Sequence, residues 1–409
     1  MATPTSFLLC VMIIFTATLM NIIDGCYGAD DQIAQRKLLF VIGDSLFDPG
    51  NNQYLMNGSK SPATSYPYGV SLHNHSTGRL SDGLIVPDFI GLFANKKVPP
   101  PFLKPGANFS DGVNFASAGA RMNLKIQLSN LDKVVKSIAE KVGHEEAKKV
   151  LMRSVYLISL GGNDYFGFNT DNPNATQSER IVYMRMVVAN LTNGFKEIYG
   201  KGGRKFAVQN VGPLGCYPMI KQMYPELNGS CASRFLSHAK LHNKALSNAL
   251  KKLSNKLPGF KYSILDYYYA LGDRINNATK YGFKVGKIAC CGNGQYNGKN
   301  CGGGGDGKEP FNVCSHPDEY VLFDGGHTTM RTNRQLAELL WNGVPNITGP
   351  YNLKQLFDFP YSICKVAYTA SLPPYLQPGT HRFTDGANFA SAGAGVLVET
   401  HPGTVCKFV

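Results

Sequence analysis

Leu38-Leu39-Phe40-Val41-Ile42-Gly43-Asp44-Ser45 is the segment of this 409-residue chain that indicates its fold class most clearly. Its apolar residues predict a buried strand that runs into a tight turn carrying a serine. Three later apolar runs also end in glycine, asparagine or aspartate, at 155–160, 205–208 and 261–265. Helical periodicity fills the intervals, at about 125–152, 178–199, 231–257 and 328–341. This alternation predicts a doubly wound α/β sheet whose ligand site lies beyond the carboxyl ends of its strands.

The overall composition is that of an ordinary globular protein. With 43% hydrophobic and 17% charged residues, the chain can bury a sizeable core, which excludes general disorder. The formal net charge is +13, but the basic residues are scattered and accompany no nucleic-acid-binding motif. We therefore expect no nucleic-acid partner. A basic protein outside the cell would instead meet acidic polysaccharide of the cell wall or another anionic surface, and the simplest interpretation is a solvated basic face without a specific partner.

Residues 1–28 are predicted to be a secretory signal peptide. An apolar run from Phe7 to Phe15 is followed by small residues around Gly28 that suit cleavage. No lysine or arginine precedes the run, so a retained membrane anchor is the alternative interpretation. No other stretch reaches the length of a membrane-spanning helix, so we expect a secreted protein without an integral span.

The cysteines agree with secretion. Removal of the signal leaves an even number, which favours disulfides without revealing their connectivity: Cys216, Cys231, Cys290, Cys291, Cys301, Cys314, Cys364 and Cys406. A zinc site is the rival interpretation, but two of these cysteines are adjacent and no C-x-x-C occurs, so no metal is expected. We expect the glycine-rich stretch 290–307 to be a surface loop stapled by disulfides. Glycosylation sequons begin at Asn57, Asn74, Asn108, Asn174, Asn190, Asn228, Asn277 and Asn346.

The chain divides into a main domain, 36–345, and a carboxyl-terminal extension, 346–409. The extension contains a partial internal repeat, because residues 374–394 resemble 101–120. Two separated copies do not make a solenoid, which needs at least three stacked units. We expect the extension to be an irregular tail without a second active site. It repeats the segment that contains Gly119, but it contains no serine block, no Gly-Asn-Asp and no D-x-x-H.

The sequence contains the four parts that an acyl-transfer hydrolase needs: a nucleophile, a base, an acid that orients the base, and donors for the oxyanion. Ser45 follows the first strand. In Asp324-Gly325-Gly326-His327 the carboxylate can fold back onto the imidazole. The backbone amides of Ser45 and Gly119 and the side-chain amide of Asn163 are the candidate donors. Asp44 and Asp48 flank the nucleophile and are assigned to capping or turn roles, with Asp44 expected to face away from the crevice.

These parts occur in an order that resembles a known family. The segments 43–52, 114–119, 161–164 and 324–327 are similar to the four sequence blocks of the GDSL lipase/esterase family, over about 38–341. Smaller matches at 78–83 and 210–216 resemble its secreted plant branch. The resemblance implies the SGNH-hydrolase fold, a flavodoxin-like three-layer α/β/α sandwich with a mainly parallel sheet. It also implies Ser45 as nucleophile, His327 as base, Asp324 as its partner, and Ser45, Gly119 and Asn163 as the oxyanion hole.

From these patterns we expect a secreted enzyme that hydrolyses carboxylic esters of a lipid or another acyl compound through an acyl-enzyme, without metal or cofactor. The alternative is a catalytically silent secreted glycoprotein of the same fold that binds cell-wall carbohydrate or a protein partner. Reactivity of Ser45 distinguishes the two hypotheses.

Overall fold

A computed structural model describes residues 36–55, 61–304 and 307–360. The predicted signal peptide, the repeat at 374–394, Cys364 and Cys406 lie outside these residues. The described part centres on a sheet with the strand order β2-β1-β3-β4-β5-β8. Its strands are β1 (Leu39–Gly43), β2 (Gly112–Asn114), β3 (Val155–Ser159), β4 (Lys205–Gln209), β5 (Lys261–Leu265) and β8 (Thr348–Pro350).

The sheet is parallel except at one edge. The first five strands of this order pair in parallel, and β8 runs antiparallel to β5, with Leu265 opposite Thr348. β1, β3 and β4 are fully buried, as expected for strands covered on both faces. The parallel arrangement brings the ends of β1 and β3 to the same edge, because Gly43 lies opposite Ser159.

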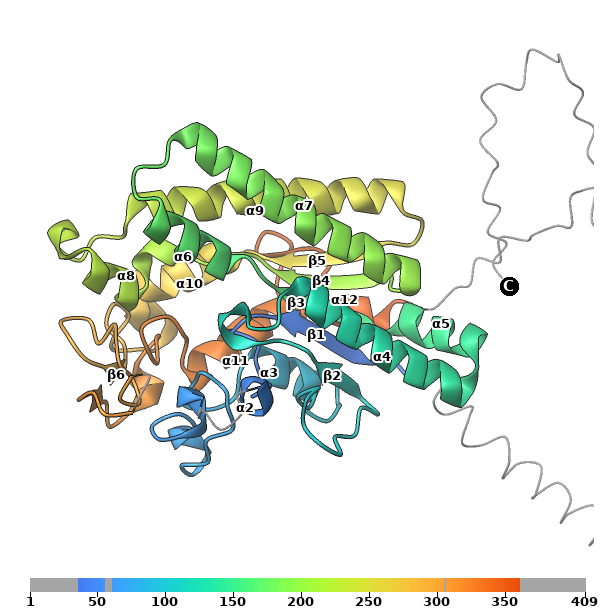
Figure 1. Cartoon of the computed structure of the whole chain (residues 1–409), viewed down its shortest axis with the longest axis horizontal. Helices are drawn as coiled ribbons and strands as arrows, with labels where there is room; N and C mark the ends of the chain where they lie inside the picture. The colour runs from blue at the N-terminus through green and yellow to red at the C-terminus, as the bar shows by residue number, and fades with distance from the viewer. Residues whose placement is uncertain (1–35, 56–60, 305–306, 361–409) are drawn as a thin grey trace, which may run out of the picture. The chain divides into compact units, whose positions relative to one another are not determined.

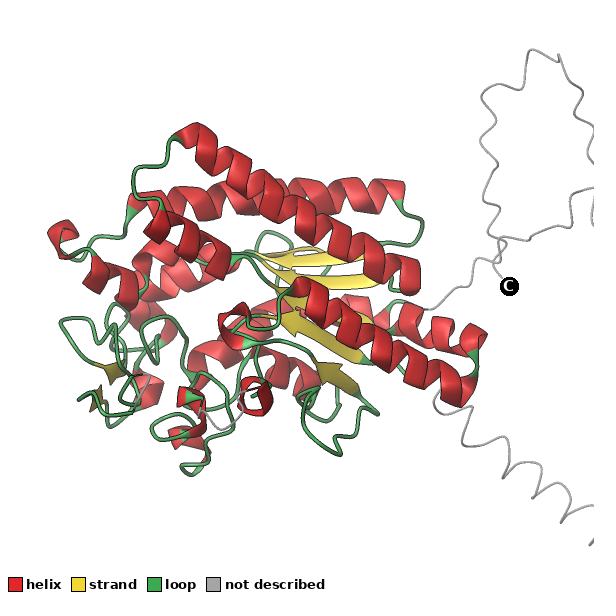
Figure 2. Cartoon of the chain, viewed as in Figure 1, coloured by secondary structure: helices red, strands yellow, loops and turns green. Residues whose placement is uncertain are grey.

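Helices cover both faces of the sheet, as the red and yellow elements of Figure 2 show. On one face, Phe40, Tyr156 and Phe206 pack against α4 (Leu124–Val142), α5 (His144–Arg153), α7 (Gln177–Lys201) and α9 (Ser233–Lys256). The opposite face packs against α3 (Val86–Phe93), α10 (Tyr267–Asn276), α11 (Met330–Asn342) and α12 (Leu353–Asp358). Figure 1 also labels α2 (Asn52–Leu55), α6 (Gly162–Asp171) and α8 (Pro218–Met223); Tyr165 of α6 and Ile220 of α8 are buried in the same core cluster as α10 and α11.

This architecture confirms the predicted three-layer α/β/α fold with a mainly parallel sheet. Two details differ from the sequence-based expectation. The helical stretch predicted at 125–152 is two helices, because Gly143 separates α4 from α5 at a φ of 80° that favours glycine. The edge strands β2 and β8 contain only three residues each, which is too short for a period of two to stand out.

The described domain continues beyond the boundary expected near 345. β8 pairs with β5, and α12 buries Leu353, Leu356 and Phe357 in the core beneath the sheet. The Nζ atom of Lys37 also donates to the carbonyl of Phe357, at 2.5 Å. Residues up to Phe359 therefore form one compact unit with the rest of the sheet.

The described residues contain three disulfides, and the even number of cysteines predicts bonds of this kind. Cys216 pairs with Cys231, Cys290 with Cys314, and Cys291 with Cys301. The last two close the glycine-rich segment around the two-stranded ribbon of β6 (Cys291–Gly292) and β7 (Asn312–Val313). We call residues 290–314 the disulfide-linked loop. Among the helices of the described residues, none has the length and apolar character needed to cross a membrane.

We expect α12 to contribute substantially to stability. Leu356→Ala removes a fully buried side chain and should lower the free energy of unfolding by about 2–5 kcal/mol. Lys354→Ala, on the exposed side of the same helix, breaks only a surface ion pair with Asp358 and should cost less than about 1 kcal/mol. Chemical denaturation of both variants measures the difference. Equal stability of Leu356→Ala and wild type would show that the domain ends before α12.

Candidate active site

Ser45 lies in the turn that directly follows β1. The amide of Asp44 donates to the carbonyl of Ser159 at 3.2 Å, which continues the β1–β3 pairing into the turn. Gly43 leaves no room for a side chain, since a Cβ there would approach the Phe47 Cβ to 2.9 Å and the Ser159 carbonyl to 3.1 Å. The strand therefore ends at a fixed place and delivers Ser45 to the carboxyl edge of the sheet.

Asp324 and His327 come from the loop before α11. The Asp324 Oδ1 atom accepts the amides of Gly326 and His327, both at 2.9 Å, so the carboxylate folds back over its own turn. Gly325 makes this turn possible, because a Cβ would meet the carbonyl oxygen of Gly298 at 2.3 Å. The carboxylate also reaches the His327 Nδ1 atom, at 2.7 Å.

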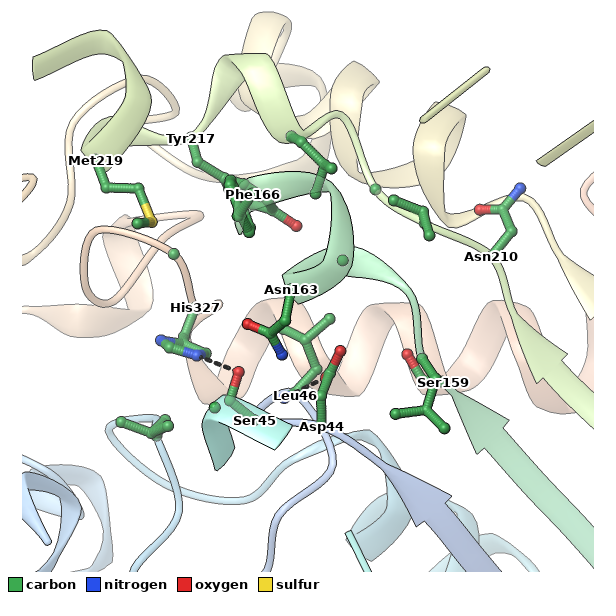
Figure 3. Close-up of a pocket in the computed structure, with 18 residues that line it drawn as sticks. Asp44, Ser45, Leu46, Ser159, Asn163, Phe166, Asn210, Tyr217, Met219 and His327 are labelled. Atoms are coloured by element: carbon green, nitrogen blue, oxygen red, sulfur yellow. Dashed lines mark hydrogen bonds between the residues drawn. The ribbon is translucent and has the colours of Figure 1, made fainter. Parts of the chain in front are cut away.

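His327 connects this loop to Ser45. Its Nε2 atom lies 2.8 Å from the Ser45 Oγ atom, the contact drawn as a dashed line in Figure 3. An ionised carboxylate only accepts hydrogen bonds, so the proton of the neutral imidazole lies on Nδ1, facing Asp324. The Nε2 atom is then free to accept the Ser45 hydroxyl proton.

Asp324 and His327 shift each other's pKa. Burial alone would raise the pKa of Asp324, but the charge and hydrogen bond of His327, with other donors, hold that pKa below its ordinary value. Burial would lower the pKa of His327, yet the carboxylates of Asp324 and, more weakly, Asp44 raise it above its ordinary value. The site is therefore suited to hold an imidazolium that forms transiently.

Asn163 and Gly119 line the same cavity as Ser45 and His327, a hollow of about 280 Å³. Asn163 is the second residue of α6, and Figure 3 shows its carboxamide beside Ser45. Gly161, which directly precedes α6, has a φ of 118°, a backbone conformation that residues with a side chain rarely adopt. Gly119 has a φ of 65° in the short 3₁₀ helix Ala118–Ala120. The structure thus brings all five sequence-predicted site residues into one neighbourhood.

A buried hydrogen-bond network positions the Gly119 segment against the Ser45 turn. Asp48 accepts the amide of Ala118 at 2.8 Å through its Oδ2 atom. Asn51 donates to the carbonyls of Asn114 and Ala116, both at 2.8 Å. In the opposite direction, Asn114 donates to the carbonyl of Phe47 at 2.7 Å. The first two sequence blocks are therefore joined by polar contacts from both sides.

Apolar side chains form much of the remaining wall of the cavity. They come from the turn after Ser45, from the start of α6 and from the segment that follows β4: Leu46, Leu160, Phe166, Val211, Leu214, Tyr217 and Met219. A wall of this kind suits the hydrocarbon part of a ligand, while the polar atoms of Ser45, Asn163 and His327 converge on one point.

A buried aromatic pair supports α6 from behind. The Tyr165 hydroxyl and the His242 Nδ1 atom lie 2.6 Å apart, and both side chains are fully buried. Burial lowers the pKa of His242 to about 3, so this imidazole is neutral. The His242 ring would also contact a Cβ at Gly161, at 3.1 Å. No spacing in the sequence indicates the contact of His242 with the Gly161 turn, because that contact depends on how the helices pack.

The flanking aspartates have the expected turn contacts, with one correction. The Oδ1 atom of Asp44 accepts the amide of Leu46 at 3.1 Å, and that of Asp48 accepts the amides of Gly50 and Asn51. Asp44 does not face away from the crevice, because it lines the cavity. Burial raises the pKa of Asp44 to about 6, although the amide of Leu46 and the charge of His327 oppose this shift.

Tyr68 is the site residue that sequence reasoning missed. Its hydroxyl donates to the Asp324 Oδ2 atom at 2.9 Å, and the two residues are 256 positions apart. No local spacing signals such a contact. For metal binding, no group of three or more histidine, cysteine, aspartate or glutamate side chains is suitably arranged within 36–55, 61–304 and 307–360.

Comparison with known proteins shows the family of this chain. The family model for GDSL-like Lipase/Acylhydrolase matches residues 39–340. GDSL esterase/lipase 1 of Arabidopsis thaliana is 41% identical, over 81% of this chain and 93% of the relative. GDSL esterase/lipase 2 of the same plant is 39% identical, over 85% and 98%. Inactive GDSL esterase/lipase-like protein 25, also from Arabidopsis, is 37% identical, over 80% and 76%. The resemblance found in the sequence is confirmed, and the chain belongs to the GDSL esterase/lipase family of ester hydrolases.

Proposed function

We propose that this protein is a secreted serine hydrolase that cleaves carboxylic esters through an acyl-enzyme, with Ser45 as nucleophile. The observation that carries the proposal is the continuous hydrogen-bonded chain from Ser45 through His327 to Asp324. This arrangement of hydroxyl, imidazole and carboxylate supports acyl transfer on unrelated folds. The apolar wall of the cavity favours an ester with a hydrocarbon part near the reacting carbonyl.

In the proposed mechanism, the Ser45 oxygen attacks the ester carbonyl while the His327 Nε2 atom accepts its proton. Asp324 stabilises the resulting imidazolium, and the oxyanion accepts hydrogen bonds from the amides of Ser45 and Gly119 and the carboxamide of Asn163. His327 then protonates the departing alcohol, which leaves an acyl group on Ser45. Water, activated by the same imidazole, releases the carboxylic acid and restores the enzyme.

Secretion is supported by the predicted signal peptide at 1–28 and by the three disulfides, a bond type that persists in oxidising compartments. The net charge of +13 is compatible with attraction to acidic cell-wall polysaccharide. These features also suit the alternative hypothesis of a silent glycoprotein. The presence of a relative named as inactive gives that alternative a concrete precedent within the family.

Substitution of Ser45 tests the function directly. Ser45→Ala should lower hydrolysis of short-chain p-nitrophenyl esters by about 10³-fold or more and abolish labelling by a fluorophosphonate probe. Ser263→Ala, which removes a buried hydroxyl of β5 that is not part of the cavity lining, is the matched control and should keep both signals. If the wild-type protein hydrolyses no ester and is not labelled by the probe, the hydrolase proposal is wrong and the alternative of a catalytically silent glycoprotein is supported.

Asn163 tests the oxyanion hole. Asn163→Ala should lower kcat by about 10²–10³-fold with little change in KM, because the carboxamide donates only to a charge that develops during reaction. Asn163→Asp preserves the size of the side chain but replaces its donor by a carboxylate, so it should be at least as impaired. Steady-state kinetics of both variants give the result, and an unchanged kcat would remove Asn163 from the mechanism.

The pH dependence follows from the raised pKa of His327. Activity should fall as pH drops through that pKa, with a midpoint above about 6.5, because only neutral imidazole accepts the Ser45 proton. Asp44→Asn removes a negative charge that favours the imidazolium, so it should move the midpoint of kcat/KM to lower pH. A profile that is flat from pH 5 to 8 would contradict His327 as the base.

A further inference from the structure

Tyr68 is held in a fixed place behind the Asp324 carboxylate. Its side chain is nearly fully buried, and its ring packs edge-on against Phe323 with a centroid distance of 5.4 Å. The Ser76 hydroxyl donates to the carbonyl of Tyr68 at 2.6 Å, which fixes the backbone as well. Burial and these two contacts restrict the movement of the phenol.

The disulfide-linked loop supplies the surroundings of this ring. Cys290, Cys291 and Cys301 form one buried cluster with Tyr68 and Phe323. The amide of Cys291 donates to the carbonyl of Phe323 at 2.7 Å, directly before Asp324 in the chain. The two disulfides thus hold together the packing that contains both the phenol and the start of the Asp324 turn.

The two oxygens of Asp324 have different partners. Oδ1 accepts two backbone amides and the closer contact of His327 Nδ1. Oδ2 accepts the Tyr68 hydroxyl at 2.9 Å, and its other partner among the described residues is the same Nδ1 atom, also at 2.9 Å. Within the part of the chain that the structure describes, the phenol is therefore the one donor to Asp324 from outside the 324–327 turn.

We propose that Tyr68 is a positioning residue of the triad: its hydroxyl fixes the plane of the Asp324 carboxylate and moderates the negative charge that Asp324 presents to His327. This inference rests on the proposed function, because it assigns a task within the Ser45–His327–Asp324 chain. It adds a fourth residue, from a segment that none of the four family blocks contains.

The direction of the effect follows from the groups that face His327. These are Asp324, Asp44 and the Ser45 hydroxyl, with Tyr68 behind Asp324. Burial raises the pKa of Tyr68 well above its ordinary value, and the Asp324 charge raises it further, so the phenol remains a donor across the working range. Without that donor, the carboxylate would act on the imidazolium with its full charge and favour the protonated histidine.

Tyr68→Phe tests this role, because it removes only the hydroxyl and retains the ring against Phe323. We expect kcat to fall about tenfold at unchanged KM, because the Asp324 carboxylate loses the contact that fixes its plane and holds the imidazole less well for proton transfer. We also expect the midpoint of the acid limb of kcat/KM to rise by up to about one pH unit. Tyr156→Phe is the matched control, since it removes a buried hydroxyl that donates to Leu151 in the other layer of the core.

An NMR titration of His327 completes the experiment, because it needs no turnover. A higher His327 pKa in Tyr68→Phe than in wild type and Tyr156→Phe supports the proposal, even if the natural ester differs from the test substrate. Identical titration curves, with kcat within twofold of wild type, would overturn it. Loss of activity in Ser45→Ala but not in Tyr68→Phe would leave the proposed function standing and remove Tyr68 alone.

Discussion

The buried hydrogen bonds between the Ser45 turn and the Gly119 segment are the interaction on which the site depends. Asp48, Asn51 and Asn114 satisfy backbone groups of the opposite segment, so neither can shift without leaving polar atoms unpaired in the core. An apolar contact would allow both segments to slide. A polar contact with fixed directions maintains the distance between the serine and the amide of Gly119.

The sheet and the loops have separate tasks in this arrangement. The parallel register of β1 and β3 brings the Ser45 turn and the start of α6 to one edge, because parallel strands all end on the same side. The histidine arrives from a loop near the end of the domain, and the disulfide-linked loop packs beside it. Cross-links are useful there, since the glycine-rich segment contributes few apolar side chains of its own.

Two buried carboxylates near His327 have opposite electrostatic environments. Asp324 accepts hydrogen bonds from His327, Gly326 and Tyr68, which compensate for burial and hold its pKa low. Asp44 has fewer compensating donors, so burial dominates and raises its pKa to about 6. One environment therefore keeps a permanent charge beside the imidazole, and the other holds a group whose charge changes near the ordinary pKa of histidine.

The features that depend on local pattern could be predicted from the amino-acid sequence. Apolar runs predicted β1, β3, β4 and β5, and the ordered motifs identified Ser45, Gly119, Asn163, Asp324 and His327 as one candidate site. The folded structure was needed to establish the strand order, the short edge strands β2 and β8, the disulfide pairing and the place of α12 in the core. It alone showed that Asp44 faces the cavity and that Tyr68 reaches Asp324. The two kinds of feature differ in sequence separation. Periodicity reflects which face of one helix or strand is buried, whereas a contact between residues 256 positions apart depends on how the buried faces pack together.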